Sequence, residues 1–264
     1  MKIGCIGAGN MAGAILRGLV GNGTDGSSLL VYDIDPQRQM ELFNDCGVCM
    51  ASNEEQVAAE VQVLILAVKP QVYQTVLPRI RDAVRRNRPL VISIAAGRTL
   101  QSIEQQLGED IAIVRVMPNI NARIGEAITA LCGNARVSDH DMAQARDIFN
   151  AIGETVMLEE SKFSGFAALA GAAPAYTFMF IDALAEAGVR QGIPKTLALQ
   201  IARQTVLGSA LLLRETGAHP RQLLDEVCSP GGITIEGVLS LQRDGMEAAV
   251  VDAVQAACDR DRSM

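Results

Sequence analysis

Short apolar runs recur along the first 158 residues and alternate with polar or amphipathic segments. Runs of this kind are typical of strands that are buried on both faces of a parallel sheet. Strands are expected over residues 2–6, 28–32, 48–51, 63–68, 90–94, 111–116, 127–132 and 154–158. Helices are expected between several of them, so the pattern predicts an α/β fold on a doubly wound parallel sheet.

The pattern changes after residue 158, where the strand-like runs stop and long helical segments begin. Helices are expected over residues 161–188, 195–216, 220–227 and 234–259, with breaks that contain glycine and proline. Two domains follow from this change, an α/β domain over residues 1–158 and an all-helical domain over residues 159–264.

Residues 163–181 carry no charge and are long enough to span a bilayer. The segment is rich in alanine and is interrupted by glycine, proline and hydroxyl residues, whereas a lipid-facing helix is rich in Leu, Ile and Val. A helix that is apolar on every face needs cover on every side. We therefore expect this segment to form a helix that a second copy of the chain covers. We do not expect it to span a membrane.

The composition supports a globular protein: 49% of the 264 residues are apolar, 3% are aromatic and the net charge is −7. It excludes disordered, collagen-like and disulfide-scaffold proteins, and the acidic total argues against nucleic acid as a partner. The six cysteines are scattered and no export signal precedes them, so free thiols in the cytoplasm are expected. Cys46 and Cys49 have C-x-x-C spacing, but a plain turn is favoured there, and no metal site is expected.

The segment from Gly7 to Ala12 has the pattern G-x-G-x-x-A and lies between a predicted strand and a predicted helix. In this context Gly7 permits a tight turn and Gly9 allows close approach of a pyrophosphate, while Ala12 lets helix and strand pack closely. The helix N-terminus, with Asn10 and Met11, offers unpaired N–H groups to the anion. A dinucleotide site is therefore predicted here.

Two residues bear on the choice of dinucleotide. Asp33 ends the second predicted strand, where an acid hydrogen-bonds the adenine ribose of NAD and repels the 2′-phosphate of NADP. Arg38 lies five residues further on and can pair with that phosphate. NADH and NADPH therefore both stay open.

Further candidate residues lie where predicted strands end, because open α/β sheets bind ligands at the carboxyl ends of their strands. One strand end carries Ala67, Val68, Lys69 and Pro70, the next carries Ala95, Ala96 and Gly97, and a third leads into Asn119. The small residues of the second group suit a backbone that lies against a flat nicotinamide.

In the helical half, the segment from Ser229 to Thr234 precedes a predicted helix. Gly231 and Gly232 free its backbone, so it is either an anion site at a helix N-terminus or a plain connector. His140 and His219 are in polar surroundings, and no His–Asp pair that could take a proton from an alcohol stands out. Reduction of a C=N bond needs no such base.

An ordered series of motifs along the whole chain resembles the pyrroline-5-carboxylate reductase family, the last enzyme of proline synthesis. The matching segments are residues 6–12 (IGAGNMA), 66–71 (LAVKPQ), 93–97 (SIAAG), 115–119 (RVMPN), 168–176 (ALAGAAPAY), 204–208 (QTVLG), 215–220 (ETGAHP) and 229–235 (SPGGITI).

The resemblance implies NAD(P)H-dependent reduction of a cyclic imino acid to L-proline. It also implies an N-terminal Rossmann domain and a C-terminal helical domain that interlocks with a second subunit, in a homodimer or a larger ring of dimers. The implied cofactor contacts are Gly9, Asn10, Met11, Ala12, Asn53, Ala67, Val68, Lys69, Pro70, Ala95, Ala96 and Gly97. The implied substrate contacts are Asn119, Ser229, Gly231, Gly232 and Thr234, with Thr234 as hydrogen-bond partner of the imine nitrogen.

The chain departs from the family pattern in three places. Residues 170–176 read AGAAPAY where the family often has SGSGPAY, Ile233 replaces a frequent threonine, and Asp33 is unusual for a family that often prefers NADPH. Two other interpretations stay open. One is a β-hydroxyacid dehydrogenase or another imine reductase, with Lys162 or Lys195 as a base, and the other is a non-catalytic dinucleotide-binding regulator.

Overall fold

The computed structural model describes residues 1–263. It has two compact units, one formed by residues 1–171 with the C-terminal residues from 261 onward and the other by residues 172–260. Residues 159–171 therefore group with the α/β part of the chain.

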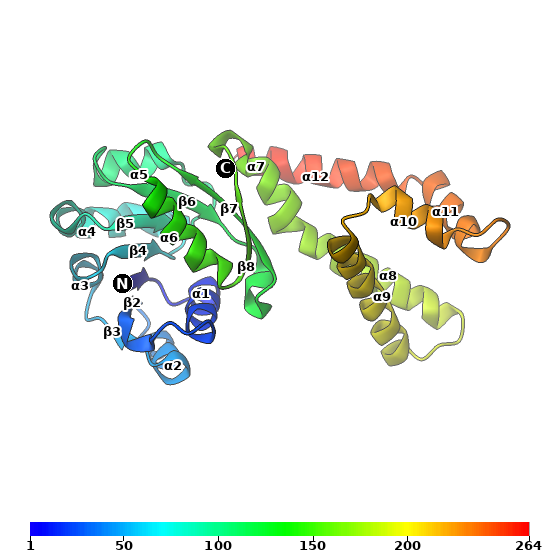
Figure 1. Cartoon of the computed structure of the whole chain (residues 1–264), viewed down its shortest axis with the longest axis horizontal. Coiled ribbons are helices and arrows are strands. Elements are labelled where there is room, and N and C mark those ends of the chain that lie inside the picture. The colour runs from blue at the N-terminus through cyan, green and yellow to red at the C-terminus, as the bar shows by residue number, and fades with distance from the viewer. Residues whose placement is uncertain (264) are drawn as a thin grey trace. The chain divides into compact units, whose positions relative to one another are not determined.

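The first unit contains one eight-stranded sheet in the order β3-β2-β1-β4-β5-β6-β7-β8 (Figure 1). Its strands are β1 (Ile3–Ile6), β2 (Leu29–Tyr32), β3 (Cys49–Met50), β4 (Val63–Leu66), β5 (Leu90–Ser93), β6 (Ile113–Met117), β7 (Ala127–Gly133) and β8 (Gly153–Met157). The chain runs outward from β1 to β3, returns to β4 and runs outward the other way. This doubly wound order places a topological switch point between β1 and β4.

The sheet is mostly parallel, as predicted, but β6 and β7 pair antiparallel. The sequence pattern did not indicate this reversal. A parallel pair needs a crossover of a dozen or more residues, whereas residues 118–126 provide only the short 3₁₀ helix η3 (Ile120–Ile124). The chain therefore turns back directly.

Helices cover both faces of the sheet. Leu16 of α1 (Asn10–Gly21), Leu42 of α2 (Pro36–Cys46) and Ile148 of α6 (Asp139–Asn150) belong to one core. Val57 of α3 (Glu54–Glu60), Ile80 of α4 (Tyr73–Asn87) and Ile103 of α5 (Leu100–Leu107) belong to the other. Buried apolar strands between two helical layers confirm the predicted α/β architecture.

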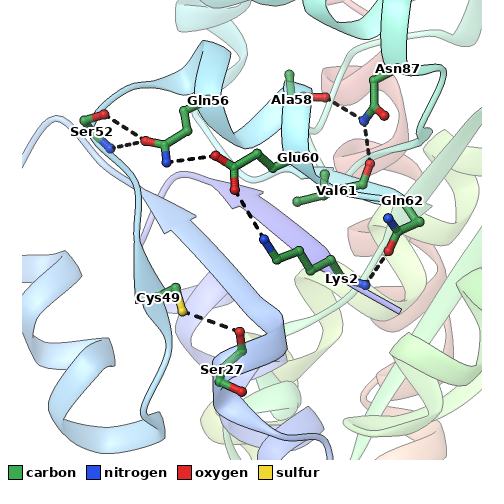
Figure 2. A network of polar contacts seen from close by, with 10 residues as sticks. All are labelled: Lys2, Ser27, Cys49, Ser52, Gln56, Ala58, Glu60, Val61, Gln62 and Asn87. Atoms are coloured by element: carbon green, nitrogen blue, oxygen red, sulfur yellow. Dashed lines mark hydrogen bonds and ion pairs between the residues drawn. The ribbon is translucent and has the colours of Figure 1, made fainter.

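The amino end of β1 is held by a polar network (Figure 2). Lys2 Nζ lies 3.2 Å from Glu60 Oε2, and the Lys2 backbone N–H donates to Gln62 Oε1 at 2.6 Å. Asn87 Nδ2 donates to the carbonyl oxygens of Ala58 and Val61 at 3.0 and 2.6 Å. These contacts tie α3 and α4 to the edge of the sheet opposite the carboxyl ends of the parallel strands.

The second unit is helical, as predicted, and contains α8 (Ala173–Arg190), α9 (Lys195–Thr216), α10 (Pro220–Val227), α11 (Ile233–Arg243) and most of α12 (Met246–Arg262). Two expected helices are interrupted. Residues 161–188 include a π-helical turn, η5 (Ala167–Ala172), after the short helix α7 (Phe163–Phe166). Residues 234–259 are divided at Gly245, whose φ of +78° ends a regular helix.

Little of the second unit is buried within one chain. Of residues 172–260, Ala185, Ala198, Ala202 and Cys258 are the buried ones, whereas large apolar side chains such as Phe178 are exposed. Two stretches, Glu160–Arg190 and Lys195–Thr216, are long and apolar enough to cross a membrane by length and composition alone.

Candidate active site

The glycine-rich turn joins β1 to α1 at the switch point. Gly7 has a φ of +103°, and a Cβ there would lie 2.6 Å from the Ala67 carbonyl oxygen, so only glycine fits. A Cβ at Gly9 would project into open space, with no atom within 4 Å. Gly9 is the N-cap of α1 and provides no side-chain hydrogen bond to the first turn. The first N–H groups of α1 therefore form an open cradle that fits a pyrophosphate.

Asp33 follows β2 and is joined to this turn by hydrogen bonds. Its Oδ2 accepts from Ala8 N at 2.6 Å, and its Oδ1 accepts from Asp35 N at 2.9 Å. Asp35 in turn is the N-cap of α2, and its Oδ2 lies 3.5 Å from Arg38 Nε. The predicted phosphate partner Arg38 is therefore paired with Asp35, and both of these side chains are exposed.

A cleft of about 260 Å³ opens at the carboxyl ends of β4, β5 and β6. The cleft is lined by Met11, Ala67, Val68, Lys69, Pro70, Ile94, Ala95, Ala96, Met117 and Pro118. It thus brings together the first turn of α1 and two of the three predicted strand-end segments. Gly97 follows directly with a φ of +70°.

Two predicted contact residues have other partners in the single chain. Asn53 is the N-cap of α3, where its Oδ1 accepts from Gln56 N at 2.8 Å. Asn119 is buried, and its Nδ2 donates to the Ala170 carbonyl oxygen in the π-helical turn at 3.1 Å. Its Oδ1 has no hydrogen-bond partner in the described chain.

The predicted substrate loop lies in the second unit. Gly231 has a φ of +65°, and Gly232 N donates to Ser229 O at 3.0 Å. Gly232 is the N-cap of α11 and provides no side-chain cap, so the first N–H groups of this helix have no side-chain acceptor there. Thr234 lies within the first turn of α11, half-buried, rather than at the cap.

The cysteines form no disulfide in the described part of the chain. All six cysteines are free, and residues 1–263 hold no group of three or more His, Cys, Asp or Glu side chains that could bind a metal. Burial raises the pKa of the Cys5 and Cys132 thiols to about 12, so these two are inert. Cys46 is buried, and Cys49 Sγ lies 3.4 Å from Ser27 O.

Sequence analysis missed three polar residues beneath and beside the cleft, namely Tyr73, Ser93 and Arg98. The Tyr73 hydroxyl lies 2.8 Å from Ser93 Oγ, and Arg98 Nη2 donates to Pro70 O at 2.7 Å. Burial raises the Tyr73 pKa, which keeps the phenol neutral. No motif marks these residues, since their contacts join segments that follow different strands.

Two family models match separate parts of the chain. Residues 160–264 match the model "Pyrroline-5-carboxylate reductase dimerisation", and residues 2–97 match "NADP oxidoreductase coenzyme F420-dependent". A pyrroline-5-carboxylate reductase of Escherichia coli is 39% identical over 264 residues, which are 100% of this chain and 98% of that relative.

Solved structures give the same result. The structure of a pyrroline-5-carboxylate reductase from Coxiella burnetii has a TM-score of 0.96 and 34% identity, covering 99% of this chain and 97% of that one. The Plasmodium falciparum pyrroline carboxylate reductase with NADP bound has a TM-score of 0.88 and 30% identity, covering 100% and 97% of the two chains.

The dimerisation match accounts for the open apolar faces of the second unit. The apolar side chains exposed on α8 and α9 lie within the region that matches the dimerisation model. The chain is therefore a homo-oligomer, and the two membrane-length helices are explained by subunit contacts.

Proposed function

The chain belongs to the pyrroline-5-carboxylate reductase family, and we propose which of its residues bind the cofactor and the substrate. It is an NAD(P)H-dependent enzyme that reduces L-1-pyrroline-5-carboxylate to L-proline. The single observation that carries the proposal is the open cradle at Gly9 beside the cleft between β4, β5 and β6. The dinucleotide-binding domain is taken as residues 1–158 and the dimerisation and substrate domain as residues 159–264. In support of this division, the dimerisation match begins at residue 160.

In this proposal the α1 cradle holds the pyrophosphate through the backbone of Gly7, Gly9, Asn10, Met11 and Ala12. Walls formed by Ala67, Val68, Lys69 and Pro70 on one side and by Ala95, Ala96 and Gly97 on the other orient the nicotinamide. Asn53 caps α3 and contacts the adenine end. The bound nicotinamide supplies a hydride to the imine carbon.

We propose that the chain prefers NADH. A 2′-phosphate carries a charge of about −2, and a carboxylate roughly 5 Å away repels it by about 1.5 kcal/mol in a water-like dielectric, a factor of about ten. Asp33 and Asp35 both stand near this position, and Arg38 is already paired with Asp35. The geometry of these three residues therefore favours the ribose hydroxyls of NADH.

Asp35→Ser tests the preference, because serine keeps a helix cap while it removes a carboxylate and releases Arg38. The kcat/KM with NADPH should rise about tenfold relative to that with NADH. Asp25→Ser is the matched control, since Asp25 also caps a short helix, by accepting from Ser27 N. A wild-type preference for NADPH, or equal ratios in both variants, would refute the assignment.

The substrate is proposed to bind at the N-terminus of α11. Ser229, Gly231 and Gly232 would hold its carboxylate on free N–H groups, and Thr234 would hydrogen-bond the imine nitrogen as that nitrogen gains a proton. Asn119 is proposed as a further substrate contact, and its buried amide Nδ2 donates to the Ala170 carbonyl oxygen.

Thr234→Val should lower kcat with the imine about a hundredfold and leave NADH affinity unchanged, because it removes the hydroxyl alone. Thr234→Ser should restore most of the rate. A Thr234→Val enzyme with normal kcat would remove Thr234 from the reaction.

The decisive experiment mixes purified protein with the imine and either reduced dinucleotide and follows dinucleotide oxidation and proline formation. No turnover with either would sink the proposal. The β-hydroxyacid dehydrogenase alternative is not favoured, because the whole-chain relatives reported above are reductases and Lys195 is paired with Asp182 at 2.7 Å. A non-catalytic regulator is likewise not favoured.

Two broader proposals remain. Exposed apolar residues on α11 and α12 as well as on α8 and α9 support a ring of dimers, which sedimentation would distinguish from a dimer. Six free thiols support a cytoplasmic location, which fractionation of cells would test.

A further inference from the structure

A buried polar contact between Tyr73 and Ser93, called the floor, adjoins the residues that line the cleft at the carboxyl ends of β4, β5 and β6. Tyr73 begins α4 and is 1% exposed, and Ser93 ends β5 and is fully buried. The Tyr73 hydroxyl lies 3.2 Å from the Leu66 carbonyl oxygen and 2.8 Å from Ser93 Oγ. Because a carbonyl can only accept, the phenol donates to Leu66 and the Ser93 hydroxyl donates to the phenol.

This floor lies where the two paired strands end, just before the residues that line the cleft. Leu66 and Ser93 are register partners at the ends of β4 and β5. The next residues on each strand, Ala67 and Ile94, already line the cleft. The Leu66–Tyr73–Ser93 contacts therefore lie one residue away from each of these two cleft walls.

A second contact joins the same two walls at the rim. Arg98 follows β5, and its Nη2 donates to the carbonyl oxygen of Pro70, which follows β4, at 2.7 Å. The Arg98 guanidinium also stacks over the Tyr73 ring, with 5.8 Å from Cζ to the ring centroid. One arginine thus touches both the opposite wall and the side chain that forms the floor.

We infer that Tyr73, Ser93 and Arg98 form a brace that holds together the two walls of the cleft where the chain leaves the paired ends of β4 and β5, with Arg98 as a positioning residue for hydride transfer. The inference rests on the proposed function, in which these walls orient the nicotinamide. Hydride transfer is sensitive to geometry, since a misplacement of about 1 Å costs roughly a hundredfold in rate. Arg98 acts through Pro70 and Tyr73 rather than on the reacting atoms.

Arg98→Ala and Tyr73→Phe are the test variants, measured in the full-length oligomer. Arg98→Ala removes the rim contact, and Tyr73→Phe removes the floor hydrogen bonds but keeps the ring. Each should lower the hydride-transfer rate about tenfold, raise the primary deuterium isotope effect on kcat and weaken NADH binding, measured by fluorescence without substrate. Arg98→Lys should recover only part of the loss, because lysine lacks the planar fork.

The isotope effect separates positioning from simple loss of folded protein, which lowers the active fraction but leaves the isotope effect unchanged. Arg81→Ala is the matched control. Arg81 lies on α4, the helix that Tyr73 begins, but its side chain is exposed and pairs with Asp82 at 3.6 Å. The hydride-transfer rate of the double variant Tyr73→Phe/Arg98→Ala should fall by less than the product of the two single losses, because both changes disrupt the same brace.

An Arg98→Ala variant with the same isotope effect and NADH affinity as the wild type would overturn the brace. A rate loss in the double variant equal to the product of the two single losses would also overturn it. If Arg98→Ala does not fold, the same readouts in Arg98→Lys and Tyr73→Phe decide. Failure of the wild-type protein to bind either NADH or NADPH would overturn the proposed cofactor cleft and the brace together, whereas wild-type behaviour of the variants would overturn the brace alone.

Discussion

A buried ion pair joins β6 to the segment that leads toward the helical unit, and its two partners differ in exposure. Glu160 Oε1 accepts from Arg115 Nη1 at 3.0 Å and from Leu100 N at 2.8 Å. The Arg115 side chain is 9% exposed and lies over the Phe163 ring, with 4.6 Å from Cζ to the ring centroid, whereas the Glu160 side chain is 31% exposed. We therefore expect removal of Arg115 and removal of Glu160 to lower the free energy of unfolding by different amounts.

Glu160→Gln leaves a buried guanidinium without its carboxylate. Breaking a buried pair costs about 3–5 kcal/mol, and partial access of water to this site reduces the expected loss to about 2–4 kcal/mol of unfolding free energy. Arg115→Met removes the buried charge and fills its space, while the more exposed Glu160 keeps its bond from Leu100 N and gains water. Its expected cost is about 1–2 kcal/mol.

Urea unfolding measures the difference in unfolding free energy between the two variants. All variants are compared at one fixed protomer concentration, because the protein is an oligomer. Glu55→Gln is the matched control, since Glu55 forms an exposed pair with Arg86 at 3.5 Å and should cost under about 0.5 kcal/mol. A larger loss in Arg115→Met than in Glu160→Gln, or a Glu160→Gln loss as small as the control, would refute the reasoning.

Three further outcomes follow from local geometry. Cys49 is exposed and should react with a thiol reagent in the native protein, whereas Cys5 and Cys132, with their pKa raised to about 12, should react only on unfolding. Gly18→Ala should cost about 1–3 kcal/mol in urea unfolding, because its Cβ would lie 2.7 Å from a backbone carbonyl oxygen of the turn between α6 and β8. Hydrogen bonds from α3 and from the residue before β1 lower the pKa of Glu60 (Figure 2), so its contribution to stability is present at neutral pH and is lost as pH falls through the lowered pKa. Glu60→Gln should therefore destabilise the protein at neutral pH and have no effect in strong acid, as followed by the urea midpoint.

The strands and the glycine-rich turn could be predicted because their causes are local. Four buried apolar residues in a row define β4, and the G-x-G-x-x-A spacing between a strand and a helix marks the turn at Gly7 and Gly9. The reversal at β7 could not be predicted from apolar content, because parallel and antiparallel central strands share it. It depends on the length of the connection.

The residues that shape the cleft were harder to find, because their contacts come from separate segments. Arg98 and Pro70 are close only after β4 and β5 have paired. The pairing of Arg38 depends on Asp35 becoming a helix cap, which turns the carboxylate toward the guanidinium three residues later. Sequence analysis offered Arg38 as a partner for the 2′-phosphate, because charge alone does not reveal that Asp35 pairs with it.

The helical unit explains the apolar excess of a chain with few aromatic residues, and it links folding to assembly. Its buried residues are three alanines and one cysteine, and a Cβ at Gly188 would lie 3.0 Å from the Ala198 Cβ, so α8 and α9 already pack as closely as their small residues allow. Closer packing within one chain cannot bury Phe178 or Leu207, which are exposed. The remaining apolar area must be buried by another copy, and each square ångström removed from water contributes about 25 cal/mol. Because that contribution exists only in the assembled protein, the free energy of unfolding has to increase with protomer concentration.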